Sequence, residues 1–123
     1  MKIRVYYEDT DAGGIVYHTN YIKYCERARS EAFFKKDMMP AECDNSGFVV
    51  RKITADFLAT SKLGDMLSVT SEILTLKSTS LVLRQEVWKE KSKVFSMDVV
   101  LVYIDHGRPR RIPENFKTLF GSL

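Results

Sequence analysis

Three carboxylates stand close together near the start of the chain, at Glu8, Asp9 and Asp11. Gly13 and Gly14 follow them, and because glycine readily takes a positive φ, the backbone can turn sharply there beside a ligand. A carboxylate held in such a loop can attack a carbonyl carbon or activate a water molecule. The stretch therefore predicts a reactive site with Asp11 or Asp9 as its acidic group.

A helix is predicted directly after this loop, from residue 21 to about residue 36, because apolar residues recur there every three or four positions. Asn20 or Thr19 is the predicted N-cap, which puts His18 at or just before the helix N-terminus. The first turn of a helix carries unpaired backbone N–H groups and a partial positive charge, so it can receive an oxygen that becomes negative during a reaction. The loop and the helix start together contain a carboxylate and backbone N–H donors, which are the groups that acyl transfer needs.

Plainer interpretations of the same residues stay open. Asp and Thr side chains often satisfy the backbone N–H groups of a turn, and a histidine near a helix start is often a surface or capping residue. A calcium-binding loop that begins at Asp9 fails on spacing, because Gly13 falls at its fifth position and Asn20 at its twelfth. A magnesium-dependent phosphotransferase using Asp9 and Asp11 would need a parallel α/β fold, which this chain does not predict.

Five strands are predicted around the loop and helix, because β-branched, aromatic and other apolar residues alternate with polar ones there. Their connections are short, which indicates antiparallel neighbours. The predicted strands are residues 2–7, 48–57, 66–76, 81–89 and 94–104, and residues 113–119 form a closing helical turn. We therefore predict an α+β fold, with a five-stranded antiparallel sheet wrapped around one long central helix in a single domain, residues 1–123. The last strand is apolar on both faces, which predicts a second copy that covers the exposed face.

Composition narrows the function classes. The chain has 123 residues, a net charge of +3 and 28% charged residues, as expected of a soluble globular domain. No basic run or RNA-binding aromatic motif accompanies the charge, so nucleic acid is not an expected partner. Cys25 and Cys43 form neither a CxxC pair nor a disulfide framework, and neither a signal peptide nor an apolar run of membrane length is present. We expect a cytoplasmic protein without a membrane span.

The stretch Tyr7-Glu8-Asp9-Thr10-Asp11-Ala12-Gly13-Gly14-Ile15-Val16-Tyr17-His18, with Tyr21, resembles the signature of the 4-hydroxybenzoyl-CoA thioesterase family of hotdog-fold proteins. Within that family it is most similar to the YbgC-type, Tol-Pal-associated acyl-CoA thioesterases. The resemblance continues through residues 26–29, 48–52 and 64–67, and so spans almost the whole chain.

The resemblance implies an acyl-CoA thioesterase with a β-α-β4 hotdog fold. It implies dimers whose sheets join into one, usually paired again into homotetramers, with acyl-CoA bound at the subunit interface. It assigns the catalytic carboxylate to Asp11 and the thioester carbonyl to the backbone N–H near His18, and it links Tyr7 and His18 to catalysis. Asp9 is expected to hold the loop, and neither a metal nor an organic cofactor is expected, because a thioester is already activated.

Substrate-binding residues are expected at three further places. Arg110 lies in the cluster Arg108-Pro109-Arg110-Arg111, where the family places a basic residue for the phosphates of CoA, and Lys52 is a weaker candidate of the same kind. Val50 is expected in the acyl pocket. A non-catalytic hotdog module that binds acyl-CoA or acyl carrier protein is the alternative function.

Overall fold

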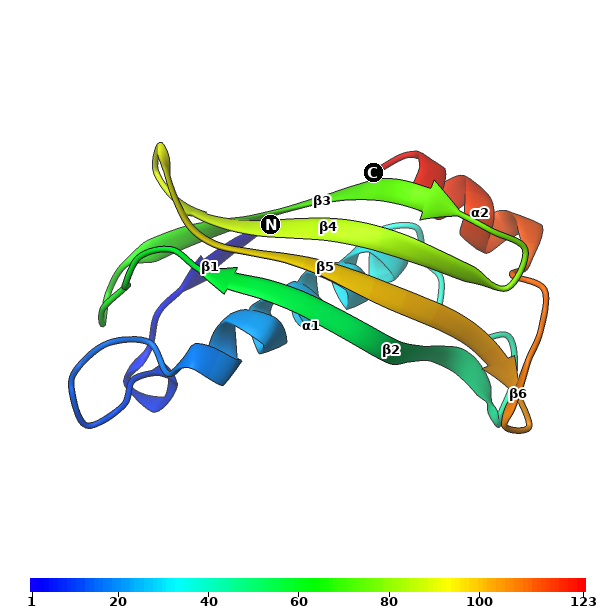
Figure 1. Cartoon of the computed structure of the whole chain (residues 1–123), viewed down its shortest axis with the longest axis horizontal. Coiled ribbons are helices and arrows are strands. Elements are labelled where there is room, and N and C mark those ends of the chain that lie inside the picture. Colours follow the sequence, from blue (N-terminus) through cyan, green and yellow to red (C-terminus); the bar gives the residue numbers. More distant parts are fainter.

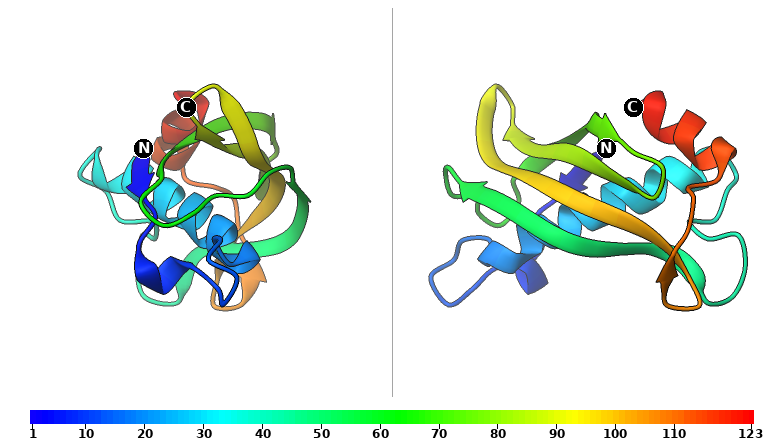
Figure 2. Two further views of the ribbon diagram at one scale, coloured as in Figure 1. Left: turned by 90° about the vertical axis from the view of Figure 1, so that its left-hand side faces the viewer. Right: turned by 45° about the vertical axis from the view of Figure 1, so that its right-hand side comes forward.

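We describe residues 1–123 from a computed structural model. The elements, in chain order, are β1 (Lys2–Arg4), a 3₁₀ turn (Tyr7–Asp9), α1 (His18–Phe34), β2 (Ser46–Phe57), β3 (Met66–Leu76), β4 (Ser80–Lys89), β5 (Ser92–Asp105), β6 (Arg108–Pro109) and α2 (Glu114–Gly121). All strand pairs are antiparallel, in the order β1-β3-β4-β5-β2, and β6 pairs with the end of β5. The sheet curls around α1, and α2 lies near one end of it (Figures 1 and 2).

The inner face of the sheet forms the core against α1. Because side chains alternate between the two faces of a strand, every second residue of β4 and β5 points inward and is buried. These residues are Leu81, Leu83, Gln85, Val87, Phe95, Met97, Val99, Leu101 and Tyr103. From α1, Tyr21, Tyr24, Cys25 and Phe33 meet them in one hydrophobic cluster. The hotdog arrangement that the resemblance implied is confirmed.

Gln85 is a polar residue in this core, with none of its surface exposed. Its Nε2 donates to the carbonyl oxygen of Cys25 at 2.9 Å and to Oγ of Ser71 at 3.0 Å, and its Oε1 accepts from Nη1 of Arg29 at 2.9 Å. A buried amide with these partners ties α1 to β3 and β4 at one register, since leaving any of these groups unpaired inside the core is costly.

An aromatic cluster closes the end of the core where α1 stops. Phe116 and Phe120 of α2 lie edge-on against Phe33, with ring centroids 5.2 and 5.6 Å apart, and Phe48 and Tyr103 complete the group. The predicted closing helical turn is thus confirmed as α2, which begins directly after Pro113.

Two local predictions were wrong, and the sheet has one short strand beyond the five predicted. The first strand ends at Arg4, and Tyr7 lies in the 3₁₀ turn. The N-cap of α1 is Tyr17 rather than Asn20 or Thr19, so His18 is the first helical residue. The short strand β6 adds a sixth member to the sheet.

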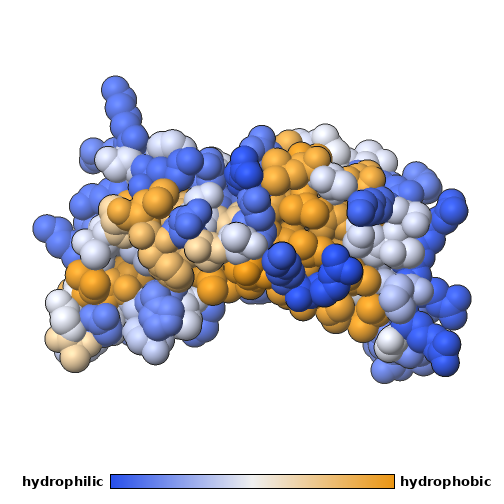
Figure 3. All heavy atoms as spheres, viewed as in Figure 1, coloured by the Kyte–Doolittle hydropathy of each residue, from blue (hydrophilic) through white to orange (hydrophobic).

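The outer face of the sheet and the edge of β2 are uncovered. Val82, Val100 and Val102 form a half-buried apolar area on the outer face, and Figure 3 shows hydrophobic side chains gathered there with hydrophilic ones around them. Strand β2 pairs with β5 on one side and has no neighbour on the other.

The fold is antiparallel, which removes the parallel α/β phosphotransferase alternative. Neither helix is long and apolar enough to cross a membrane.

Candidate functional site

The loop between the 3₁₀ turn and α1 is closed by backbone pairing. Thr10 and Val16 form an antiparallel bridge, and N–H of Asp11 donates to the carbonyl oxygen of Ile15 at 2.9 Å. At the tip, Gly14 has a φ of 82°, a value that a side chain disfavours. N–H of Val16 also donates to the carbonyl oxygen of Ser61 at 2.8 Å. The loop is therefore held against the β2–β3 connection as a defined turn.

Asp9 anchors this loop to the first turn of α1. Its side chain is only 7% exposed; Oδ2 accepts from N–H of Tyr6 at 2.9 Å and Oδ1 accepts from Nδ2 of Asn20 at 2.9 Å. Its carbonyl oxygen accepts from N–H of Tyr17 at 2.9 Å. Burial raises the pKa of the neighbouring Tyr24, and the charge of Asp9 raises it further, so that phenol stays neutral. The prediction that Asp9 holds the loop is confirmed.

Asp11 differs from Asp9 because its carboxylate faces solvent. Its Oδ1 accepts from N–H of Gly13 at 2.8 Å, which fixes the side chain, while its Oδ2 accepts no hydrogen bond from the chain. A hollow of about 430 Å³ lies beside it, lined also by Tyr7, Thr10 and Leu63, among others. The tyrosine side chain is 83% exposed. One carboxylate oxygen is thus fixed in place and the other is free to act on a molecule in the hollow.

The start of α1 supplies the donors that the sequence predicted. No side chain caps the helix, and the N–H groups of His18 and Thr19 donate no hydrogen bond within the chain. The imidazole of His18 is exposed and lies between the rings of Tyr17 and Phe57, at centroid distances of 4.6 and 5.9 Å. Free N–H groups at a helix start can bind a negative oxygen.

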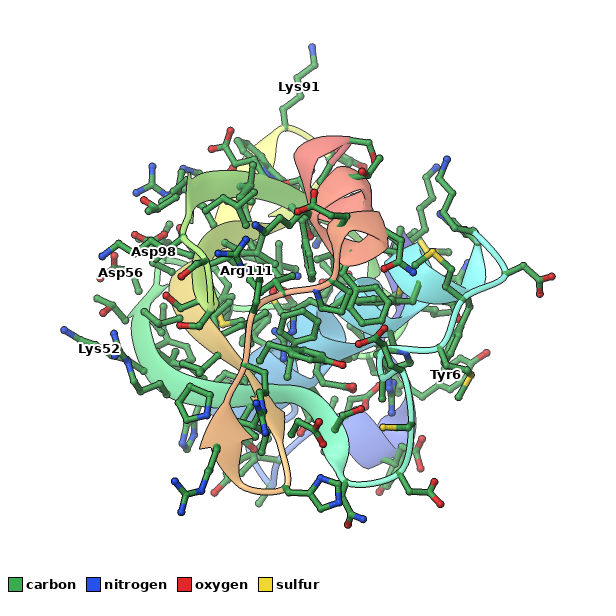
Figure 4. The ribbon with its side chains drawn as sticks, turned by 90° about the vertical axis from the view of Figure 1, so that its right-hand side faces the viewer. Tyr6, Lys52, Asp56, Lys91, Asp98 and Arg111 are labelled. Carbon is green, nitrogen blue, oxygen red and sulfur yellow. The ribbon has the colours of Figure 1, made fainter.

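The remaining predicted site residues lie elsewhere. Arg110 follows β6, at the opposite end of the long axis from the Asp11 loop (Figure 1). Lys52 projects from β2 away from the helix (Figure 4), and Val50 lines a separate groove beside the C-terminal half of α1. Within one chain, the structure brings Asp11 and Tyr7 together at one hollow. His18 stands apart from this hollow, between Tyr17 and Phe57, and Arg110, Lys52 and Val50 lie elsewhere.

Two residues of the site have roles that the sequence does not predict. The sequence predicts Asn20 as a capping residue, whereas its side-chain amide donates to Asp9 from inside the first helical turn. Leu63 lines the hollow from the β2–β3 connection, and no local pattern marks it. No group of three or more His, Cys, Asp or Glu side chains is placed to hold a metal ion.

Comparisons with known proteins point to one family. The family model of the thioesterase superfamily matches residues 13–96. The chain is 40% identical to a protein named acyl-CoA thioesterase YbgC from Helicobacter pylori over the full length of both chains. It is 38% identical to the acyl-CoA thioester hydrolase YbgC of Escherichia coli O157:H7, over 96% of this chain and 92% of that one. A crystal structure of a probable thioesterase from Bartonella henselae superposes with a TM-score of 0.85 at 28% identity, covering 92% of this chain and 97% of that chain.

Proposed function

The chain belongs to the thioesterase superfamily, and we propose that it is an acyl-CoA thioesterase, which cleaves an acyl-CoA with water to a free acid and CoA. The observation that carries the proposal is the carboxylate of Asp11. One of its oxygens is fixed by Gly13 and the other is free, beside a hollow and close in sequence to a helix start with unused N–H donors. A binding module would need the hollow but would have no use for this free carboxylate oxygen.

The reaction adds the oxygen of water to the thioester carbonyl carbon and breaks the carbon–sulfur bond. Asp11 either removes a proton from the attacking water or attacks the carbonyl itself, forming a mixed anhydride that water then opens. In both routes the carbonyl oxygen becomes negative, and the free N–H groups of His18 and Thr19 stabilise it. The thiolate of CoA leaves and takes up a proton. The side chains of His18 and Tyr7 position the thioester between these groups.

A second copy of the chain completes the site in this proposal. Strand β2 has a free edge of twelve residues, with Val49, Val50 and Phe57 more than 40% exposed along it. A two-fold axis pairs two such edges antiparallel, so that the start of one β2 lies beside the end of the other. The start of β2 pairs with β5 next to β6, and its end lies against His18. Arg110 of one copy thereby comes toward the Asp11 end of the other.

The roles of the remaining residues follow from this arrangement. Arg110 and Lys52 bind the phosphates of CoA, and Val50 contacts the acyl group. The apolar area on the outer face of the sheet pairs two dimers into a homotetramer. An acyl carrier protein, which presents the same thioester, is the alternative donor. The two cysteines are free, which supports a reducing compartment such as the cytoplasm.

Thiol release from a panel of short, long and aromatic acyl-CoAs, measured with EDTA present, tests the activity. We expect turnover of at least one thioester and no loss of rate on chelation, because the proposed steps use only side chains and backbone N–H groups. An acyl carrier protein thioester with the same acyl group separates the two donors. Tight binding of acyl-CoA without thiol release, on the other hand, would favour the non-catalytic binding module.

Sedimentation velocity tests the second copy. The chain has a mass of 14.2 kDa, and we expect a species of twice or four times that mass at micromolar concentration. On dilution, the fraction of this species and the thiol release per chain should fall together, because each proposed site contains residues of two chains. A protein that sediments as a single chain and keeps its full specific activity would show that one chain carries the whole site.

A further inference from the structure

A second groove opens between the C-terminal half of α1 and the start of β2. Its volume is about 380 Å³, and its walls include Phe33, Phe48 and Val50, with Leu101 of β5 on the sheet side. Aromatic and aliphatic walls of this kind suit the hydrocarbon part of a ligand. The polar residues that α1 contributes are Glu26, Arg29 and Ser30, and they lie along one wall.

Arg29 lines this groove without a carboxylate partner. The side chain crosses from α1 to the sheet, where its Nη1 donates to the buried Gln85, and no carboxylate oxygen lies within 4.0 Å of its guanidinium. Glu26 lines the groove three residues earlier, but its Oε1 accepts from the hydroxyl of Ser30 at 2.9 Å. A guanidinium carries five N–H donors, and only one of them has a partner in the chain.

The guanidinium is also partly withdrawn from water. Burial lowers the pKa of Arg29, which reflects the cost of keeping its charge there. A partly desolvated cation with unused donors gains from an oxygen that accepts their hydrogen bonds. The groove thus combines apolar walls with one fixed set of donors, which is how small-molecule pockets orient a ligand.

We propose that this groove receives the far end of the acyl group, and that Arg29 selects acyl groups with an uncharged oxygen there, a hydroxyl or a carbonyl. This inference rests on the proposed thioesterase activity. The acyl group is expected to be uncharged at this end because Glu26 lines the same groove. The negative charge of Glu26 would repel an acyl group that bears a carboxylate. A hydroxyl avoids that repulsion and accepts a hydrogen bond from Arg29.

The proposed dimer brings this groove toward the reacting carbonyl. Arg29 follows His18 by eleven residues, which at 1.5 Å per residue is roughly 16 Å along the axis of α1. Antiparallel pairing of two β2 edges shortens the path, because the groove lies at the start of β2 and the partner's helix start lies at the end of the neighbouring strand. The hydroxyl therefore belongs at the far end of the acyl chain and not beside the thioester.

The test compares kcat/KM for an ω-hydroxyacyl-CoA with that for the alkyl acyl-CoA of the same chain length. We expect the wild type to prefer the hydroxylated substrate by at least ~10-fold, the effect of one hydrogen bond to a charged group. Arg29→Met should bring the ratio of the two kcat/KM values to about 1, whatever its effect on the alkyl substrate, and Arg29→Lys, which keeps the charge but not the planar set of donors, should retain part of the preference. Arg27→Met is the matched control, because Arg27 is exposed on the same helix and does not line the groove.

The ratio of the two kcat/KM values separates selection from a structural role. If Arg29 only holds Gln85 and α1 in place, Arg29→Met lowers both values equally and the ratio stays at its wild-type value, which overturns the inference. A wild type that cleaves the alkyl thioester without preference also overturns it, while the thioesterase activity stands. A wild type that cleaves neither substrate overturns both.

Discussion

Replacing Asp11 by asparagine is expected to lower kcat for thioester hydrolysis by at least ~10²-fold and to leave the fold intact. Asparagine keeps a side-chain oxygen at the position that accepts from N–H of Gly13 at 2.8 Å, so the turn is preserved. It loses the negative charge on the oxygen that has no partner in the chain, and with it the ability to remove a proton or to attack a carbonyl. Thiol release with a saturating acyl-CoA measures the effect.

Asp44→Asn is the matched control, because Asp44 is an exposed aspartate in the loop before β2 and makes no side-chain hydrogen bond or ion pair in the chain. It should turn over at the wild-type rate. Thermal unfolding of both variants should coincide with that of the wild type, since both carboxylates are already solvated. Equal rates for the wild type and Asp11→Asn would contradict the proposed role of Asp11, and the alternative of a binding module would then be favoured.

The fold was predictable from the sequence because its strands carry a clear alternation. Along β5 the spacing places residues 95, 97, 99, 101 and 103 on one face, and the structure shows that this face is the one in the core. The start of α1 was predicted less well. The apolar repeat begins at Tyr21, but the chain already turns helical at His18, because Asp9 holds the amide of Asn20 and the N–H of Tyr17 from outside the helix. The spacing of apolar residues predicts a helix start, and a polar contact of this kind adds nothing to that spacing.

The candidate site was predictable only in part for the same reason. Asp11, Tyr7 and His18 lie within twelve residues, so a local motif could group them. Arg110 follows β6, at the other end of the molecule from the Asp11 loop, and nothing in its local sequence indicates the second chain that brings it near in the proposed dimer. The sequence does not predict the groove of Arg29, because Gln85, which orients the guanidinium, lies on a strand 56 residues later.

Replacing Asp9 by alanine is expected to lower the free energy of unfolding by roughly 2–4 kcal/mol, because two hydrogen bonds to a buried charged group are lost. The N–H of Tyr6 and the amide of Asn20 would then lack these acceptors, and Asn20 is only 8% exposed. Urea unfolding followed by circular dichroism measures the change. Asp44→Ala should stay within about 0.5 kcal/mol of the wild type, as expected for a surface position.

Asp9→Ala should also lower kcat, since the loop that carries Asp11 loses its attachment to the first turn of α1. Activity and stability measured together then distinguish the roles of the two aspartates. Asp11→Asn removes activity at wild-type stability, whereas Asp9→Ala removes stability first and activity through it, so that added substrate or lower temperature should recover part of the rate only in the second case. If Asp9→Ala unfolds like the wild type, the hydrogen bonds of Asp9 do not hold the loop. The position of the Asp11 carboxylate would then depend on Gly13, the one residue that donates to its side chain.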